Sequence, residues 1–308
     1  MPNLRTRFSQ SPDDQRIRVK LFGIGSAGCN MIDGAPFPTV AVSSSSADLA
    51  RCRSERKLLI GQDRLLGLSD SGPELVKQVP TLVGHELLDI FNNTDVAFLM
   101  CGLGGFTGSM GTRILSSVAK ARSSLGIVLA ATPFSAESLR RREMAQQAIS
   151  SIARTSPVCI EFPNDELSSL APNLPLSRAF SIMNAIMMRP VMDLCGAMSR
   201  TDIASFRQVL GESARGRFGL GLARGDDRVE RAVHDALTSP WFDFSLGDAT
   251  AAIVVYSAAD PWDREADRIL SLMESQMPSA RIVWGSYPDI SLGERIRISV
   301  VLCRNPSG

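Results

Sequence analysis

The chain contains 308 residues, of which 44% are hydrophobic and 21% are charged, and its formal net charge is +1 at pH 7. This composition is that of a folded globular protein and excludes wholesale disorder. The near-zero net charge provides no bulk attraction to nucleic acid or to an anionic membrane surface.

Cysteines, histidines and apolar runs narrow the class further. The six cysteines are scattered without a C-x-x-C pair, which indicates free thiols buried in a reducing cytoplasm. The two histidines have no neighbour at metal-ligand spacing, so neither a zinc site nor a His-based triad is expected. No apolar run approaches the roughly 20 residues that span a bilayer. We therefore expect a cytoplasmic protein with no nucleic-acid partner, no metal held by protein side chains alone and no direct membrane insertion.

Strands and helices are predicted to alternate through the first half of the chain, after a disordered tail over residues 1–15. Apolar runs of strand length occupy residues 17–24, 40–42, 95–101, 126–132 and 158–162. Helical spacing of apolar residues occupies 74–91, where Pro80 is expected to introduce a kink, and also 109–122 and 136–153. This alternation predicts a mainly parallel sheet with helices on both faces.

The second half is predicted to form a smaller α+β domain. A long helix over 176–194, interrupted at Pro190, precedes it. Helices are predicted over 205–212, 228–237 and 263–276, and strands over 249–256, 281–284 and 295–302, while 216–225 is a Gly-rich stretch. The predicted organisation is a tail over 1–15, a first domain over 16–175, a central helix over 176–198 and a second domain over 199–308.

Two Gly-rich segments each follow a predicted strand and open into a helix. The first covers residues 23–30 and the second covers residues 102–109. Backbone N–H groups of such a turn, together with the positive end of a helix dipole, favour a phosphate. Two of them at one edge of a parallel sheet are expected to hold a single polyphosphate. Neither contains the lysine of a Walker P-loop, so this is not a P-loop protein.

The first loop also permits a different interpretation. Gly23, Gly25 and Gly28 match the G-x-G-x-x-G pattern of dinucleotide-binding proteins. Such an enzyme needs an acidic residue about 20 positions further on, to bind the ribose hydroxyls. Serines occupy 43–46 there, and Asp48 lies slightly beyond. An NAD-linked oxidoreductase therefore remains an alternative that depends on this loop alone.

The second loop resembles the G-G-G-T-G-[ST]-G signature of the FtsZ/tubulin family, with Phe106 and Met110 at two glycine positions. The first loop resembles the family's G-x-G-G-x-G-x-N, with Asn30 as the final Asn. The resemblance then continues in chain order over 68–74 (a loop that senses the γ-phosphate), 132–141, 162–167, 179–184, 219–240 and 291–301, and thus spans about 17–302.

This resemblance implies a tubulin/FtsZ-like α/β fold, with a Rossmann-like parallel-sheet GTP-binding domain over 16–175 and an activation-type α+β domain over 199–308. It implies GTP or GDP as ligand, with Mg²⁺ accompanying GTP. Phe180 is implied to stack on guanine while Asn184 reads its edge, although a core position for Phe180 is the alternative. The implied nucleotide-binding residues are Gly25, Ser26, Ala27, Gly28, Asn30, Gly104, Gly105, Phe106, Thr107, Gly108, Ser109, Pro133, Glu137, Arg141, Asn164, Phe180 and Asn184.

The hydrolysis loop of the family differs here. In the family an acidic loop of one subunit, roughly N-x-D-F-A-D-V-R, completes hydrolysis of the GTP on the next. The matching stretch keeps the first acid as Asp202, which is the catalytic candidate, but has Ser205 at the second acid and Arg200 at the Asn. A hydroxyl polarises water less than a carboxylate does, so slow hydrolysis is predicted. Arg200 is either a charge-offsetting group or a solvent-facing side chain.

The resemblance further implies a head-to-tail filament, with a second copy of this chain as partner and another FtsZ as a further candidate. Because the sequence stops at Gly308, just past the predicted globular body, the linker and terminal peptide of division FtsZ are expected to be absent. The leading hypothesis is an FtsZ-like paralogue with GTPase activity. The alternative is a structural or regulatory paralogue that binds nucleotide without useful hydrolysis.

Overall fold

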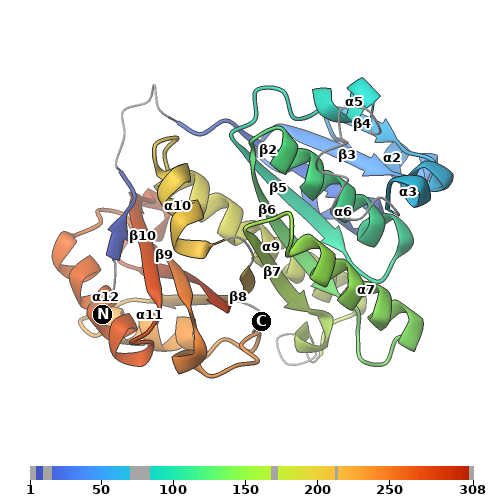
Figure 1. Ribbon diagram of the computed structural model, residues 1–308. Helices are drawn as coiled ribbons and strands as arrows, with labels where there is room; N and C mark the ends of the chain where they lie inside the picture. Colours follow the sequence, from blue (N-terminus) through green and yellow to red (C-terminus); the bar gives the residue numbers. More distant parts are fainter. Residues whose placement is uncertain (1–4, 10–15, 70–83, 168–172, 212–213, 305–308) are drawn as a thin grey trace. The chain divides into compact units, whose positions relative to one another are not determined.

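A computed structural model describes residues 5–9, 16–69, 84–167, 173–211 and 214–304 (Figure 1). The chain divides into two compact units. One is Arg18–Met187, and the other combines Met1–Ile17 with Met188–Gly308. The long helix α9 (Leu176–Ala197) contributes residues to both, and it continues through Pro190, where the sequence predicted an interruption.

The unit Arg18–Met187 is built on a parallel sheet, as predicted. The strands follow the order β7-β6-β5-β2-β3-β4, and every neighbouring pair is parallel. Their bounds are β2 Val19–Ile24, β3 Thr39–Ser43, β4 Arg56–Leu59, β5 Val96–Gly102, β6 Leu125–Thr132 and β7 Val158–Pro163. The sequence did not predict β4, because its RKLL segment is short and charged.

Helices cover this sheet, so the side chains on both faces of its strands are buried. Alternate residues of β5 (Ala97, Leu99, Cys101) join the core cluster beneath α6 and α7, as expected for side chains that point to opposite faces in turn. The helices are α1 Gly25–Ile32, α2 Ser46–Arg51, α3 Gln62–Ser69, α5 Gly84–Asp89, α6 Phe106–Ala121, α7 Leu139–Ile152 and the 3₁₀ turn η3 Asn164–Glu166.

The second unit contains a mixed sheet. β1, β10 and β9 are parallel to one another, whereas β11 is antiparallel to both β9 and β8. The strands are β1 Arg5–Arg7, β8 Ala214–Ala223, β9 Ala251–Ala258, β10 Arg281–Pro288 and β11 Ile296–Arg304. The helices are α10 Asp202–Leu210, α11 Arg228–Leu237 and α12 Asp263–Gln276, with short turns η4 Leu246–Asp248 and η5 Ile290–Leu292.

The Gly-rich stretch 216–225 lies mostly in strand β8. Gly219 and Gly221 point to the same face of this strand, two residues apart, where α11 packs closely on it. A Cβ built on Gly221 would lie only 1.8 Å from the carbonyl oxygen of Ala232. These glycines therefore allow close helix-to-strand contact, which is one of the strand contexts in which glycine occurs.

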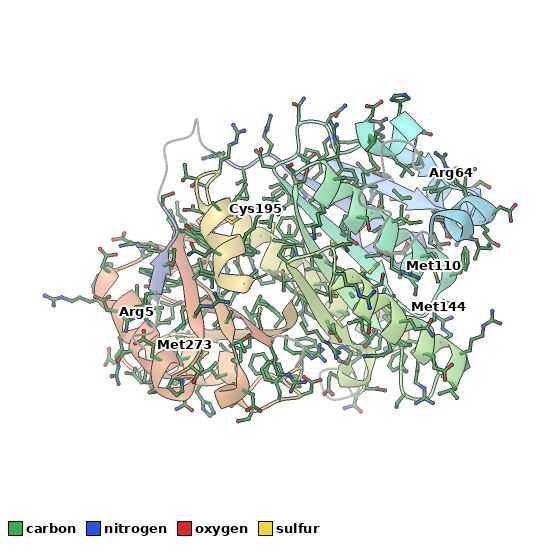
Figure 2. All side chains as sticks on the ribbon, viewed as in Figure 1. Arg5, Arg64, Met110, Met144, Cys195 and Met273 are labelled. Carbon is green, nitrogen blue, oxygen red and sulfur yellow. The ribbon has the colours of Figure 1, made fainter. Side chains whose placement is uncertain are left out.

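The disordered tail predicted for 1–15 does not describe Arg5–Arg7, which form β1. This strand pairs in parallel with the edge strand β10, in the register Arg5↔Ile282 and Arg7↔Trp284. Arg5 also forms an ion pair with Glu274 of α12. Figure 2 labels Arg5 and Met273, the residue that precedes Glu274 in this helix. Three residues in a polar context carry too little periodicity to predict a strand, because the edge that orders them is almost 280 positions away in the sequence.

The cysteines agree with the expectation of free thiols. All six cysteines are free, and all but Cys195 are buried. Burial raises the pKa of the Cys29 and Cys101 thiols to about 12, so these side chains are packing groups. Within the described ranges, no helix has both the length and the hydropathy required to cross a bilayer.

Candidate nucleotide-binding site

A cavity of about 730 Å³ lies in the unit Arg18–Met187, where its parallel strands end. The last residue of β2 (Ile24), the last of β5 (Gly102) and Ala131 of β6 contribute to its wall. Ligands of open parallel sheets bind at the carboxyl ends of the strands. The residues implied as nucleotide-binding that line this cavity are Gly25, Ser26, Ala27, Asn30, Gly105, Phe106, Thr107, Gly108, Pro133, Glu137, Arg141, Asn164, Phe180 and Asn184.

The two Gly-rich loops lie against each other at the base of the cavity. Gly25 and Gly104 have φ values of +72° and +88°, which are costly for any residue with a Cβ. A Cβ on Gly25 would be 3.1 Å from the amide nitrogen of Gly108, and one on Gly102 would be 2.8 Å from Ala27 Cβ. Glycine at these positions allows the two loops to touch, so that both face one ligand.

The starts of α1 and α6 bring unpaired backbone N–H groups to the cavity. Neither helix has a side-chain hydrogen bond at its N-cap, which is Ile24 for α1 and Gly105 for α6. The first backbone N–H groups of a helix have no partner within the helix itself. Because both helices begin at the cavity, these donors and the positive ends of two helix dipoles are directed at the place where a phosphate would lie.

Three of the implied residues do not line the cavity and instead shape its loops from behind. Ser109 is fully buried, and its Oγ accepts a hydrogen bond of 3.0 Å from the Gly104 amide. Gly28 lies against β5, where a Cβ would be 2.3 Å from the Met100 carbonyl oxygen. The Gly-rich motif includes both residues that line the cavity and residues that hold the loop in shape, because the loop needs both kinds.

A serine-rich turn after β3 adds polar groups that the sequence did not assign to the site. Ser44, Ser45 and Asp48 line the cavity, and the hydroxyls of Ser44 and Thr107 lie 2.5 Å apart. Asp48 Oδ2 accepts a hydrogen bond of 3.0 Å from Ser43 Oγ, while the Asp48 amide donates to Ser45 Oγ, the cap of α2. The sequence contained one signal for this turn, the S-x-x-D spacing of Ser45 and Asp48, which predicts a helix start directly after a buried strand.

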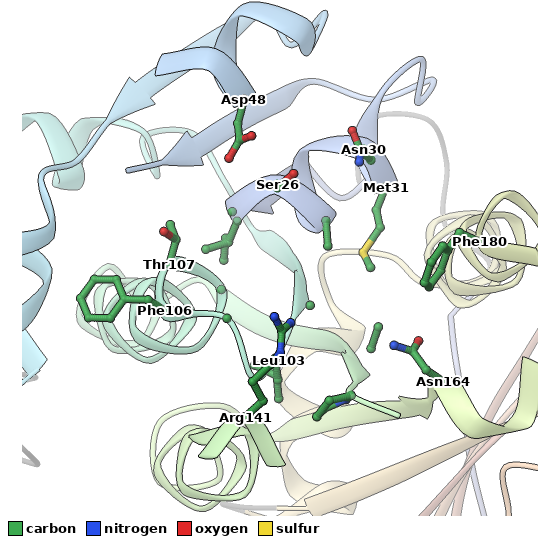
Figure 3. A pocket seen from close by; sticks show the side chains of 18 of the residues that line it. Ser26, Asn30, Met31, Asp48, Leu103, Phe106, Thr107, Arg141, Asn164 and Phe180 are labelled. Atoms are coloured by element: carbon green, nitrogen blue, oxygen red, sulfur yellow. The ribbon is translucent and has the colours of Figure 1, made fainter. Parts of the chain in front are cut away.

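Aromatic residues form the opposite end of the cavity. Phe180 remains 37% exposed, which argues against the alternative that it is a core residue. Its ring contacts Phe134 edge to face, with ring centroids 6.2 Å apart. Figure 3 shows Phe180 and Asn164 on the side of the cavity away from Asp48 and Thr107. Asn164 Oδ1 is buried and has no hydrogen-bond partner among the described residues, as expected of a group that a ligand completes.

One ion pair crosses the lower wall of the cavity. Arg141 Nε lies 2.7 Å from Glu137 Oε2, and Glu137 Oε1 accepts a hydrogen bond of 2.9 Å from the Phe134 amide. Arg141 is directed into the cavity (Figure 3). Among the described residues, the lining contains two carboxylates, Asp48 and Glu137, and one guanidinium, Arg141. These side chains give no excess of positive charge, so the backbone amides would carry most of the phosphate binding.

The two departures from the glycine signature do not fill the loop. Phe106 lies at the margin of the cavity, and its ring points away from the side of Asn164 and Phe180 (Figure 3). Phe106 and Met110 both pack against the core cluster of this unit, and the Met110 sulfur lies 3.4 Å from Arg113 Nη1. The segment 68–74, predicted to be the loop that senses the γ-phosphate, lies mostly outside the described ranges, because these end at residue 69 and resume at residue 84.

The segment predicted to act in hydrolysis belongs to the other unit. Asp202 begins α10 and is 5% exposed, Ser205 is half-buried one turn later, and Arg200 is exposed in the preceding turn. Asp202 accepts hydrogen bonds from Ser9 and Ser199. Across the described segments, no three His, Cys, Asp or Glu side chains are grouped closely enough to hold a metal ion.

Comparison with known proteins agrees with this geometry over most of the chain. Residues 35–172 match the Tubulin/FtsZ family GTPase domain, and residues 215–304 match the FtsZ family C-terminal domain. The cell division protein FtsZ of Methanothermobacter thermautotrophicus is 31% identical over 306 residues, covering 94% of this chain and 80% of that protein. Cell division protein FtsZ 1 of Archaeoglobus fulgidus is 30% identical over 300 residues, covering 92% and 81% respectively.

Solved structures show the same fold. An FtsZ dimer from M. jannaschii has a TM-score of 0.80 at 24% identity and covers 94% of this chain and 89% of its own. A GTPγS-bound protofilament of CetZ2 from Haloferax volcanii has a TM-score of 0.73 at 21% identity, with coverages of 93% and 92%. The dinucleotide alternative, which depended on one loop, has no support in these relatives. The chain belongs to the FtsZ/tubulin family.

Proposed function

We propose that this protein binds GTP or GDP in the cavity between the two Gly-rich loops, assembles head to tail with further copies of itself and hydrolyses GTP slowly where subunits meet. The observation that carries the nucleotide assignment is the pair of uncapped helix starts, α1 and α6, facing one cavity whose other end is aromatic. Such a cavity suits a ligand with a polyphosphate at one end and a flat base at the other.

Base and ribose would occupy the aromatic end. Phe180 offers a partly exposed ring for stacking, and Asn184 lies one helical turn further along α9 on the same face. Asn164 brings a second amide group with an unpartnered oxygen, which suits the donors on the edge of guanine. Glu137, held by Arg141, is the carboxylate available for the ribose hydroxyls.

Magnesium fits the phosphate end. Mg²⁺ is commonly bound by one or two carboxylates together with phosphate oxygens of the substrate and water. Asp48 would be the protein ligand, with Ser44 and Thr107 beside it. The ion would offset the repulsion between Asp48 and a triphosphate.

Self-assembly is supported by what the relatives' structures contain, an FtsZ dimer and a CetZ2 protofilament. A head-to-tail contact joins two different surfaces and does not close, so it produces filaments. In this arrangement the loop containing Asp202 would meet the nucleotide of the next subunit. Replacement of the second acid by Ser205 supports slow hydrolysis, and an assembly without useful hydrolysis is the second candidate function.

Removing the Phe180 ring tests the nucleotide assignment. Phe180→Ala is expected to weaken binding of a fluorescent GTP analogue about tenfold, because stacking of a base on an aromatic ring contributes about 1–3 kcal/mol. Leu139→Ala, an exposed apolar residue that does not line the cavity, is the control and should bind as the unaltered protein does. Equal affinities for GTP and NAD, or no effect of Phe180→Ala, would contradict the assignment.

Restoring the missing acid tests the hydrolysis assignment. Ser205→Asp is expected to raise GTP turnover per subunit about tenfold above the assembly threshold, because a carboxylate positions and polarises water better than a hydroxyl. Phosphate release is measured against protein concentration. The control is Ser205→Asn, which has similar size without the charge and should change turnover little. If Ser205→Asp turns over GTP at the original rate, the loop does not act on the nucleotide.

A further inference from the structure

The amino-terminal segment Arg5–Ser9 is bound to the second unit by several independent contacts. β1 extends the sheet at β10, and the Phe8 amide donates a 2.6 Å hydrogen bond to the Trp284 carbonyl. The Arg7 guanidinium lies 4.7 Å from the centre of the Trp284 ring and also pairs with Asp263. Sheet hydrogen bonds, charge and a cation–π contact all hold the same five residues, which we call the strap.

Phe8 is the anchor of the strap, and a notch in β10 receives it. Its side chain is 2% exposed and stacks on Phe206 of α10, with ring centroids 6.4 Å apart. A Cβ on Gly285 would lie 2.5 Å from Phe8 Cδ2 and 3.1 Å from Ala197 Cβ. Glycine at 285 therefore leaves the space that the Phe8 ring fills. The strap is thus joined directly to the helix that begins with Asp202.

Ser9, at the end of the strap, binds the Asp202 carboxylate. Asp202 Oδ1 accepts hydrogen bonds of 2.9 Å from both the amide and the hydroxyl of Ser9. Oδ2 accepts hydrogen bonds from the amide and the hydroxyl of Ser199, at 2.8 and 2.7 Å. The hydroxyls of Ser9, Ser199 and Thr201 lie 2.7–2.8 Å from one another. Because the two serine hydroxyls donate to Asp202, the Thr201 hydroxyl is the donor left for one of them.

This network leaves Asp202 no oxygen lone pair for another ligand. An ionised carboxylate offers about four acceptor positions, and four donors fill them here. The side chain is also shielded, since the residue is 5% exposed. A carboxylate that polarises a water molecule needs one free acceptor position directed at that water. In the strapped arrangement Asp202 cannot serve a neighbouring subunit's nucleotide.

We propose that the strap is a built-in inhibitor of hydrolysis, and this proposal rests on the function proposed above for Asp202. Both donors to Oδ1 come from the strap, whereas both donors to Oδ2 come from Ser199, three residues away on the same turn. Release of the strap frees Oδ1 alone. Oδ2 stays held, so the carboxylate remains oriented while its other oxygen becomes available to the water that attacks GTP.

Two variants undock the strap without altering Ser9 or Asp202. Gly285→Ala fills the space that the Phe8 ring occupies, and Phe8→Ala removes that ring without adding bulk. If one of the two variants fails to fold, the other still tests the proposal. Gly247→Ala is the matched control, because a Cβ there meets only a Ser245 hydroxyl at 3.9 Å. If the strap is released in about a tenth of the molecules of the unaltered protein, a variant in which it is always released should turn over GTP about tenfold faster.

The measurement is GTP turnover per subunit at saturating GTP, together with GTP affinity, for each variant alone and combined with Asp202→Asn. The expected result is higher turnover in Gly285→Ala and Phe8→Ala, unchanged affinity, and no gain when Asp202→Asn is also present. Amide hydrogen exchange over Arg5–Ser9 should rise in both variants but not in Gly247→Ala.

The outcomes separate this proposal from the one on which it rests. If Asp202→Asn lowers turnover but undocking the strap, verified by hydrogen exchange, leaves it unchanged or lowers it, the strap is a structural brace and the inhibitory role is wrong. A gain that persists with Asp202→Asn would also overturn it. If Asp202→Asn alone leaves turnover unchanged, Asp202 has no part in hydrolysis, and the proposed function of the loop fails together with the strap.

Discussion

Replacing Gly108 with alanine is expected to lower GTP affinity at least a hundredfold. A Cβ at this position would lie 2.1 Å from the carbonyl oxygen of Gly102, at the end of β5, a separation that real Cβ atoms do not show. Either the strand end or the start of α6 must move, and both carry the loop that faces the cavity. A hundredfold loss corresponds to about 2.7 kcal/mol of binding free energy.

The same substitution is expected to reduce the free energy of unfolding by about 1–3 kcal/mol, as overpacking of a well-filled site usually does. Gly61→Ala is the matched control, because a Cβ there has nothing within 4 Å. Calorimetric titration with GTP and urea unfolding would be measured on both. If folded Gly108→Ala binds GTP as tightly as Gly61→Ala, the second loop does not hold the phosphates.

Gly221→Ala is expected to cause the largest loss of stability in the second unit. The added methyl group would lie 1.8 Å from the Ala232 carbonyl oxygen and 2.7 Å from its carbonyl carbon, so α11 must lift from β8. Because α11 covers a buried cluster that includes Val233 and Leu237, this displacement loosens the core. We expect about 3 kcal/mol of destabilisation or more, at the upper end for overpacking.

Thermal unfolding measures this effect, and about 3 kcal/mol corresponds to a fall of about 5 °C in Tm for a chain of 308 residues. Gly247→Ala, in the same unit with an open Cβ position, should unfold within about 2 °C of the unaltered protein. A similar Tm for both variants would mean that α11 does not rest on β8 as closely as described.

The first sheet was predictable because its strands are buried on both faces. A segment such as Val96–Gly102 shows a nearly continuous apolar run, and the following glycines mark its end. β8 was missed for the opposite reason. Gly219 and Gly221 lower strand propensity, and only the position of α11 explains their presence. The break predicted at Pro190 was wrong, because α9 continues through this residue.

At the candidate site, the Gly pattern predicted which loops gather but not which atoms face the cavity. Ser109 belongs to the motif, yet its hydroxyl is used to hold Gly104. Asp48 belongs to a pattern that predicts a helix start, not a ligand contact, and it still lines the cavity. The state of Asp202 depends on Ser9, 193 positions away, and no local pattern reports a contact of that range.

The contact between the two Gly-rich loops has a consequence for how relatives of this protein diverge. Gly25 lies against Gly108, and Ala27 lies against Gly102, so each loop is part of the other's surroundings. Three of these four positions already lack a side chain, so bulk gained at any one of them would push the two loops apart. Phe106 and Met110 lie outside these contacts, so their side chains leave the approach of the two loops unchanged.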